Sequence, residues 1–149
     1  MHKRTIYLIG PIGGMSYEDA TKWRLEAREV LEDIGYEVLD PMTGKECLKG
    51  ETSIGVGLGN ANSVKNGYIY HSDLHRINRA DVLLANLLKM SDKQSIGTFF
   101  EYGYGAAKDK TIVTVTADPY VTAHPFIAAS SIVVASLEEA YELLAKMTR

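Results

Sequence analysis

The chain has 149 residues, 46% of them hydrophobic, and a formal net charge of -3. This length and composition predict one domain with a full core. No basic cluster is present, which argues against a nucleic acid polymer as partner but leaves a small nucleotide open. The single cysteine, Cys47, excludes an internal disulfide and a multi-thiolate metal site, which predicts a reducing, cytoplasmic location. No run approaches the roughly 20 apolar residues that a membrane span requires.

The beginning of the chain has the pattern of a βαβ unit. Residues 5–9 are β-branched and apolar and precede the loop GPIGG, which predicts a first strand. The apolar run is too short for a signal-peptide core of roughly 7–15 residues. Apolar residues then recur at helical spacing between an N-cap at Ser16 and a C-cap at Gly35. A second strand is predicted over 36–39.

Residues 42–67 have a different character, with six glycines and no regular periodicity. A loop of this length in a compact domain is either functional or a mobile surface segment without a role. We predict a glycine-rich active-site loop. The GVGLG run within it lacks the lysine of a Walker motif and follows no strand, so we do not interpret it as a phosphate loop.

The remainder alternates between helices and strands. The predicted elements are a helix at 68–78, an apolar strand within 80–87, a helix ended by Lys108 and Lys110, strands at 111–116 and 131–135, and a last helix capped by Ser136. Residues 117–130 are predicted as a loop and a small-residue segment. This alternation predicts an α/β fold: a doubly wound, mostly parallel five-stranded sheet, flavodoxin-like or Rossmann-like, with helices on both faces.

The stretch 95–105 (SIGTFFEYGYG) follows the most apolar strand and carries Glu101. Thr98 and Glu101 have the spacing of a capping box, in which the glutamate only satisfies a backbone amide. Alternatively, Glu101 lies in the first helical turn at the carboxyl edge of the sheet, where the helix dipole favours an ionised carboxylate suited to be a nucleophile. Small Gly97, Gly103 and Gly105 would let a ligand approach closely.

Tyr7 and Asp73 are the other candidate catalytic residues. By default Tyr7 is a core aromatic of the first strand, and Asp73 is a solvated helix residue. The ends of the first and third strands flank the same crevice, however, and a phenol beside two carboxylates could hold one as nucleophile and the other as proton donor. His71 and His75 lack a third ligand at a recognisable spacing, so we predict that they face solvent and that no metal is bound.

Three segments together resemble a known family, the nucleoside 2-deoxyribosyltransferases with the related 2'-deoxynucleoside 5'-monophosphate N-hydrolases. The segments are 6–12 (IYLIGPI), 73–87 (DLHRINRADVLLANL) and 95–105, which occur in order over most of the chain. The resemblance implies a single domain of this type over 1–149, with 42–67 as its active-site loop. It also implies an enzyme that acts on a small nucleoside or nucleotide without a cofactor.

By this resemblance Glu101 attacks the anomeric carbon of deoxyribose, Tyr7 orients it, and Asp73 assists proton transfer. An ionised carboxylate can trap the oxocarbenium-like sugar that forms when an N-glycosidic bond breaks. The leaving base needs a proton, so a second acid is required. An incoming base then gives transfer, and water gives hydrolysis.

Two departures from the family pattern concern phosphate recognition. Transferases of the family often carry an aspartate where this chain has Ser95, and the serine is similar to the N-hydrolase branch, in which it contacts phosphate. The arginine expected in the first loop of that branch is missing, and loop amides or Arg24 could substitute.

The resemblance also implies substrate contacts and a shared site. The predicted substrate-binding residues are Gly10, Ile12, Asn86, Ser95, Gly97, Thr98 and His124. Family members are similar in completing each pocket from a neighbouring subunit, so we predict a homo-oligomer in which the region around His124 supplies that residue.

Two other hypotheses remain open. In a dinucleotide-dependent oxidoreductase, Asp40 after the second strand would bind a ribose, although the first loop lacks the full glycine fingerprint. In a nucleotide sensor, the pocket and the oligomer would be kept without catalysis.

Overall fold

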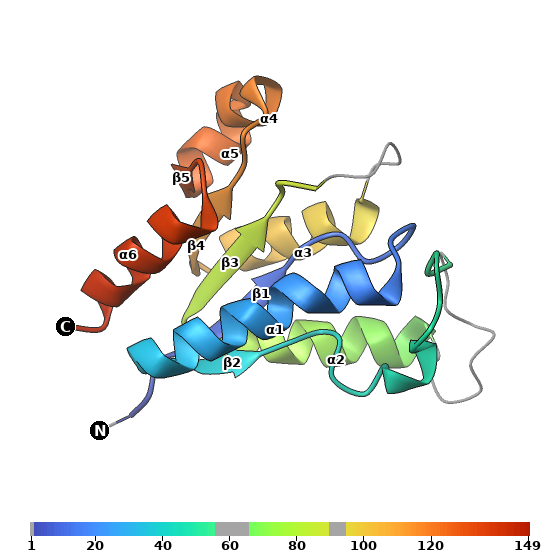
Figure 1. The fold of residues 1–149 in the computed structure, drawn as a ribbon. Helices are drawn as coiled ribbons and strands as arrows, with labels where there is room; N and C mark the ends of the chain where they lie inside the picture. Colours follow the sequence, from blue (N-terminus) through green and yellow to red (C-terminus); the bar gives the residue numbers. More distant parts are fainter. Residues whose placement is uncertain (1, 56–65, 90–94) are drawn as a thin grey trace.

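A computed structural model describes residues 2–55, 66–89 and 95–149. Its five strands form one sheet in the order β2-β1-β3-β4-β5, with every neighbouring pair parallel (Figure 1). The strands are β1 (Thr5–Ile9), β2 (Glu37–Leu39), β3 (Val82–Asn86), β4 (Thr111–Val115) and β5 (Ile132–Val134). This order confirms the predicted doubly wound, flavodoxin-like sheet.

Helices cover both faces of the sheet, as predicted. They are α1 (Tyr17–Ile34), the 3-10 helix η1 (Glu46–Leu48), α2 (Asn66–Arg79), α3 (Ile96–Ala107), α4 (Pro119–Ala123), α5 (Pro125–Ser130) and α6 (Leu137–Met147). The predicted caps of α1 are confirmed: Ser16 accepts a hydrogen bond from the amide of Asp19, and Gly35 has a φ of 115°. None of the described helices combines the length and apolar character needed to cross a membrane.

Side-chain alternation along the strands divides the core into two halves. Leu8 and Leu84 pack on one side with α1 and α6, whereas Tyr7 and Leu83 pack on the other with α2 and α3. The reason is that successive residues of a strand face opposite sides of the sheet. Tyr7 therefore lies on the α2/α3 face. Asn86, two residues after Leu84 in β3, lies on the α1/α6 face.

The described part of the glycine-rich region, 42–55, is packed rather than loose. Met42, Leu48 and Ile54 form a small core with Ala20 of α1. The amide of Ile54 donates to the carbonyl of Met15 at 2.7 Å, which ties this segment to the loop after β1. The prediction of irregular structure is wrong at η1 and at the start of α2, and residues 56–65 of the predicted loop lie outside the described residues.

Residues 117–130 contain the short helices α4 and α5, so the prediction of a loop is wrong there. Asp118 caps α4 by accepting from the amide of Tyr120, and His124 caps α5 by accepting from the amide of Phe126. A proline occupies the first helical position after each cap. This pairing of a capping side chain with proline is a helix-start signal that the sequence carries.

Gly105 of α3 lies close to β3, whereas Gly97 and Gly103 of the same helix lie in open surroundings. A Cβ added to Gly105 would lie 2.1 Å from Cδ1 of Leu83, so this glycine allows α3 to pack against β3. Gly97 and Gly103 have no described atom within 4 Å of such a Cβ. The room at Gly105 thus serves the packing of helix on sheet and not the approach of a ligand.

Candidate active site

Glu101 lies in the second turn of α3, not in the first. The helix begins at Ile96 with Ser95 in the N-cap position, and the Thr98 hydroxyl hydrogen-bonds that of Ser95. A capping box of Thr98 and Glu101 is therefore wrong, because Thr98 is already inside the helix. Thr98, Tyr102 and Gly105 form the buried stripe of α3, and Glu101 lies at its border.

Glu101 and Tyr7 meet between α3 and β1. Glu101 is partly exposed as a residue, but its Oε2 atom is buried, as is the Tyr7 hydroxyl. Neither oxygen has a hydrogen-bond partner of ordinary geometry among the described residues. The two groups nevertheless act on each other's ionisation, so the contact is a close donor–acceptor approach without a well-formed hydrogen bond.

The environment of Glu101 favours its neutral form. Burial raises the pKa of Glu101 to about 8, and the negative charge of Asp73 acts in the same direction. The Tyr7 hydroxyl and the positive charges of Arg24 and Lys45 oppose this shift. The carboxyl group is therefore poised to change charge near neutral pH rather than permanently ionised.

Tyr7 keeps its proton over the whole physiological range. Burial, followed by the negative charges of Glu101 and Asp73, raises its pKa well above the usual value of a phenol. A neutral phenol is a hydrogen-bond donor, and Glu101 is the adjacent acceptor.

Asp73 is buried on α2, with 6% of its surface exposed, so the alternative of a solvated helix residue is wrong. Its Oδ1 accepts a hydrogen bond from Nη1 of Arg76 at 2.9 Å, and its Oδ2 lies 3.9 Å from Nζ of Lys45. Burial raises the pKa of Asp73, whereas Lys45 and Arg76 lower it. The structure thus brings all three predicted catalytic residues into one electrostatically coupled cluster.

Lys45 and Arg76 are not among the residues that the sequence predicts for the site. Lys45 is only 4% exposed, and burial lowers the pKa of its ammonium group while Asp73 and Glu101 raise it. Arg76 lies three residues after Asp73 on the same helix, a spacing that could have suggested the pair. Lys45 had no comparable signal, because only the packing of the segment 42–55 brings it to α2.

Arg24 is fully buried and has a structural role, so the idea that it substitutes for a phosphate-binding arginine is wrong. Its guanidinium donates to the carbonyl of Gly10 at 2.9 Å and to that of Ala20. Its Nε lies 3.7 Å from Oδ1 of Asp40, which also accepts from the amide of Met42. The Asp40 carboxylate is buried and interacts with Arg24 and the amide of Met42, so it is not available to bind a ribose. This removes the support for an oxidoreductase.

The predicted substrate-binding residues are distributed over several places. Gly10 is crowded, since an added Cβ would lie 2.9 Å from the ring of Trp23. Ile12 packs on the small core of the segment 42–55. Ser95, Gly97 and Thr98 share the first turn of α3, one turn before Glu101.

Two of the predicted contacts are not brought to the Glu101 cluster within this chain. Asn86 lies on the opposite face of the sheet. His124 lies between α4 and α5, where its ring contacts those of Tyr120 and Phe126. His71 and His75 are exposed, which confirms the prediction that their side chains face solvent.

The two cavities that we describe lie away from this cluster. One, of about 270 Å³, adjoins Trp23 and Asn86 on the α1 face, and the other, of about 640 Å³, lies between the start of α1 and the segment 40–52. Neither is lined by Tyr7, Asp73 or Glu101. Within the described residues the cluster is therefore a buried carboxyl–phenol arrangement beside β1.

Fold and cluster together define a doubly wound α/β protein with a pair of buried carboxyl groups beside its central strands. The model of the nucleoside 2-deoxyribosyltransferase family matches residues 6–142, and the chain belongs to this family. A search of curated protein sequences finds no match.

Solved structures with the same fold differ in what they do. The 2-deoxyribosyltransferase of Bacillus psychrosaccharolyticus is 21% identical over 92% of this chain and 90% of its own, with a TM-score of 0.66. The CMP N-glycosidase of Clostridium botulinum is 18% identical over 95% and 98%, with a TM-score of 0.58. The molybdenum cofactor binding protein of Rippkaea orientalis is 13% identical over 100% and 99%, with a TM-score of 0.60. At these identities the likeness concerns the fold alone.

Proposed function

We propose that this protein cleaves the N-glycosidic bond of 2'-deoxynucleosides or their 5'-monophosphates and passes the deoxyribose to another base or to water. The observation that carries the proposal is the coupled cluster of Glu101, Tyr7 and Asp73 in a member of this family. A buried carboxyl group with a neighbouring phenol and a second carboxyl group supplies the parts that glycosyl transfer needs.

In the proposed reaction an oxygen of ionised Glu101 attacks C1' of the sugar. The bond from C1' to the base nitrogen breaks, its electrons pass to the base, and Asp73 delivers the proton that the base requires. A nitrogen of an incoming base or a water molecule then attacks C1', its proton passes to the deprotonated Asp73, and the bond from C1' to Glu101 breaks to release the carboxylate. Tyr7 donates toward Glu101 and holds its orientation.

The proposed attack requires that the Glu101 carboxyl group be ionised. With a pKa of about 8, the carboxyl group is mostly neutral at pH 7 in the free protein. The Tyr7 hydroxyl and the charges of Arg24 and Lys45 lower the pKa of Glu101 and so increase the fraction of this residue that is ionised. In this scheme burial makes the carboxylate reactive, because it is poorly solvated once ionised.

The N-hydrolase reaction on 5'-monophosphates is the more specific candidate. The position of Ser95 supports this candidate. Ser95 lies at the N-terminus of α3, and its side chain caps no backbone amide there. The hydroxyl groups of Ser95 and Thr98 and the amides of the first turn could together bind phosphate oxygens. Ser95→Asp should then weaken the use of monophosphates more than the use of nucleosides, because it adds a like charge.

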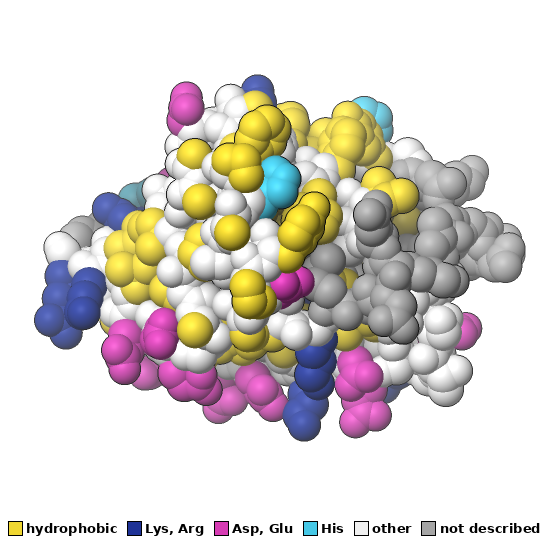
Figure 2. All heavy atoms as spheres, turned by 90° about the horizontal axis from the view of Figure 1, so that it is seen from above, with side chains coloured by type: hydrophobic (Ala, Val, Ile, Leu, Met, Phe, Trp, Pro, Cys, Tyr) yellow, Lys and Arg dark blue, Asp and Glu magenta, His cyan; other side chains and the backbone are white. Residues whose placement is uncertain are grey.

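We also propose that the protein works as a homo-oligomer whose partner copy completes each site near His124. Large exposed apolar side chains support this proposal. They include Tyr68, Tyr70, Ile96, Phe99, Phe100, Tyr120 and Phe126. Figure 2 shows hydrophobic side chains gathered with a histidine on the face seen from above. Size-exclusion chromatography with light scattering tests this, and a monomer at working concentrations contradicts it.

Product analysis tests the main proposal. The protein is incubated with 2'-deoxynucleosides and 2'-deoxynucleoside 5'-monophosphates, each with and without a second free base, and products are separated by chromatography. A new nucleoside indicates transfer, and free base without acceptor indicates hydrolysis. Intact-protein mass spectrometry after an acid quench should show a deoxyribosyl adduct that Glu101→Ala lacks.

Two results contradict the proposal. Unchanged substrate together with measurable binding indicates a sensor, as in a protein that keeps the pocket without catalysis. Turnover that survives in Glu101→Ala removes this residue from the mechanism. Lys49→Ala, at an exposed position, is the matched control for expression and folding.

A further inference from the structure

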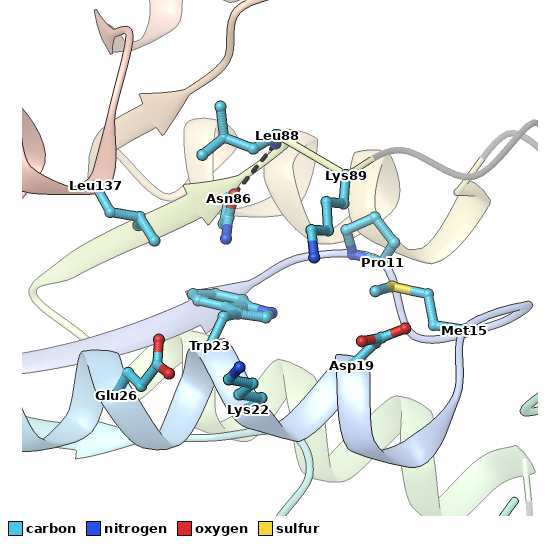
Figure 3. A pocket seen from close by; sticks show the side chains of 10 residues that line it. All are labelled: Pro11, Met15, Asp19, Lys22, Trp23, Glu26, Asn86, Leu88, Lys89 and Leu137. Atoms are coloured by element: carbon cyan, nitrogen blue, oxygen red, sulfur yellow. Dashed lines mark hydrogen bonds between the residues drawn. The ribbon is translucent and has the colours of Figure 1, made fainter. Parts of the chain in front are cut away.

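A cavity of about 270 Å³ lies on the face of the sheet opposite Glu101. Its walls come from α1, from the loop after β1 and from the end of β3, with Leu137 of α6 closing one side (Figure 3). The carboxyl ends of β1 and β3 are the point at which the winding of the sheet reverses. Ligands of doubly wound proteins bind in the crevice at this point.

Asn86 presents an unused hydrogen-bond donor to this cavity. The residue is only 9% exposed, and its Oδ1 accepts from the amide of Leu88 at 3.1 Å. This bond fixes the orientation of the amide group and leaves Nδ2 without an acceptor among the described residues. Figure 3 shows Nδ2 directed across the cavity toward Trp23. Nδ2 is not one of the fully buried polar atoms that lack a partner, so it is accessible from the cavity and can donate to an acceptor atom there.

Trp23 supplies an aromatic wall. Its ring is partly buried, packs on the α1/α6 core and extends along the floor of the cavity in Figure 3. The guanidinium of Arg24 lies 4.7 Å from the ring centroid and holds the ring in place. Met15 and Leu137 add apolar surface beside it. A flat ligand could therefore stack on the ring or lie against its edge.

Among the described residues that line the cavity, the numbers of positive and negative side chains are equal. Lys22 and Lys89 contribute two positive charges, and Asp19 and Glu26 contribute two negative ones. A lining without net charge does not select a phosphate or a metal cation. It suits a neutral molecule that carries both acceptors and donors.

We propose that this cavity binds a small, neutral, planar nitrogen heterocycle of the nucleobase type. A carbonyl oxygen or ring nitrogen of the ligand accepts from Nδ2 of Asn86, its ring contacts Trp23, and its N–H groups reach the carboxylates at the rim. The volume is sufficient for one heterocycle. The site is separated by the sheet from Glu101, and occupancy does not require turnover there.

Trp23 makes the proposal testable, because it is the only tryptophan of the chain. Its indole N–H gives a single resonance in a spectrum of the nitrogen-15-labelled protein. Adenine, hypoxanthine, cytosine and uracil are titrated separately against the wild type, Asn86→Asp and Glu101→Gln. Asn86→Asp keeps the oxygen that accepts from Leu88 and replaces the free N–H donor by an oxygen, so it is a matched variant.

At least one base should shift the indole resonance in a saturable manner, equally in the wild type and Glu101→Gln. The same base should bind at least tenfold more weakly to Asn86→Asp, since a donor is lost and two acceptors then face each other. The proposal is overturned if no base gives a saturable shift or if Asn86→Asp binds the base with unchanged affinity. Loss of the shift in Glu101→Gln also overturns it, because binding would then occur at the catalytic cluster. If Asn86→Asp does not fold, Trp23→Leu followed by saturation-transfer NMR of the ligand decides the question, and undiminished binding overturns the proposal.

Failure of this proposal and failure of the proposed enzymatic function are distinguishable. The indole titration reports occupancy on the α1 face, whereas product chromatography reports chemistry at Glu101. An inactive protein that still shifts its indole resonance with a free base retains the second site.

Discussion

The Tyr7 hydroxyl and the Glu101 carboxyl meet between β1 and α3, two elements far apart in the chain, and neither buried oxygen has a well-formed hydrogen bond within the described part of the chain. An unsatisfied pair of this kind is costly to the fold, by about 1–3 kcal/mol for each polar group. A buried polar group without a partner needs an explanation, and a catalytic role is one of them. The pair is therefore the place where stability and activity should respond to mutation in opposite directions.

Tyr7→Phe should lower activity and leave the fold as stable or more stable. Loss of the hydroxyl removes a group that lowers the pKa of Glu101, so a smaller fraction of Glu101 is ionised at pH 7. A lost interaction of about 1.4 kcal/mol would reduce that fraction about tenfold. Removal of an unsatisfied buried oxygen should raise the free energy of unfolding by up to about 1 kcal/mol. Steady-state kinetics and denaturant unfolding measure the two effects, and a parallel loss of both would indicate that Tyr7 acts only in the core.

The pH dependence of kcat/KM should show an ascending limb with an apparent pKa near 8, the value that burial imposes on Glu101. A nucleophile must be ionised, and kcat/KM reports groups of the free enzyme. Asp73→Asn removes a negative charge that raises the pKa of Glu101, so the limb of its residual activity should move to lower pH. Asp33→Asn, at an exposed position of α1, should leave the limb in place. An unchanged apparent pKa of this limb in Asp73→Asn would show that the titrating group is not Glu101.

Lys45→Met should reduce activity by tenfold or more and move the same limb to higher pH. The buried ammonium lies 3.9 Å from Asp73 and favours the ionised form of Glu101. Methionine keeps most of the side-chain volume without the charge. Lys49→Met is the control, because Lys49 belongs to the same segment but is exposed. Equal activities of the two variants would exclude an electrostatic role for Lys45.

Glu101→Gln should stabilise the protein increasingly as the pH rises from 5 to 8. The folded-state pKa of Glu101 is raised, so the neutral form is favoured by folding. Its contribution to stability is complete below the unfolded-state pKa and is lost as the pH rises toward the folded-state pKa of about 8. The difference in free energy of unfolding between variant and wild type should grow by up to about 3 kcal/mol over this range. A difference independent of pH would mean that Glu101 is ionised in the folded protein throughout.

Gly105→Ala should destabilise the protein by about 1–3 kcal/mol, because the added methyl group would lie 2.1 Å from the fully buried Leu83 side chain. Gly103→Ala, two residues earlier in the same helix, meets no described atom within 4 Å. It should be neutral or stabilising by up to about 1 kcal/mol, the helix propensity of alanine over glycine. Thermal unfolding of both variants measures the contrast, and similar effects would show that the close contact of α3 with β3 does not limit stability.

Much of the architecture could be predicted from local patterns. The β1 strand and both caps of α1 appear at the predicted residues, since β-branched runs, a serine before a helix and a glycine after it act over a few residues. Helices α4 and α5 were missed although Asp118 and His124 cap them, because small and polar residues outweighed these signals in the prediction. The three catalytic candidates were found through the family resemblance and the shared crevice of β1 and β3, not through the spacing of any one motif.

The sequence alone determined the order of the five strands and the doubly wound class, and it singled out Glu101 and Asp73 as candidates; these inferences depend on short-range periodicity or on motifs in chain order. Only the tertiary structure decided that Lys45 joins Asp73, that Arg24 and Asp40 are enclosed, and that Asn86 faces away from Glu101. The physical reason is that burial and charge coupling arise between segments distant in the chain. The pKa of Glu101 is the clearest case, because desolvation sets it, and desolvation exists only once α3 has packed against β1.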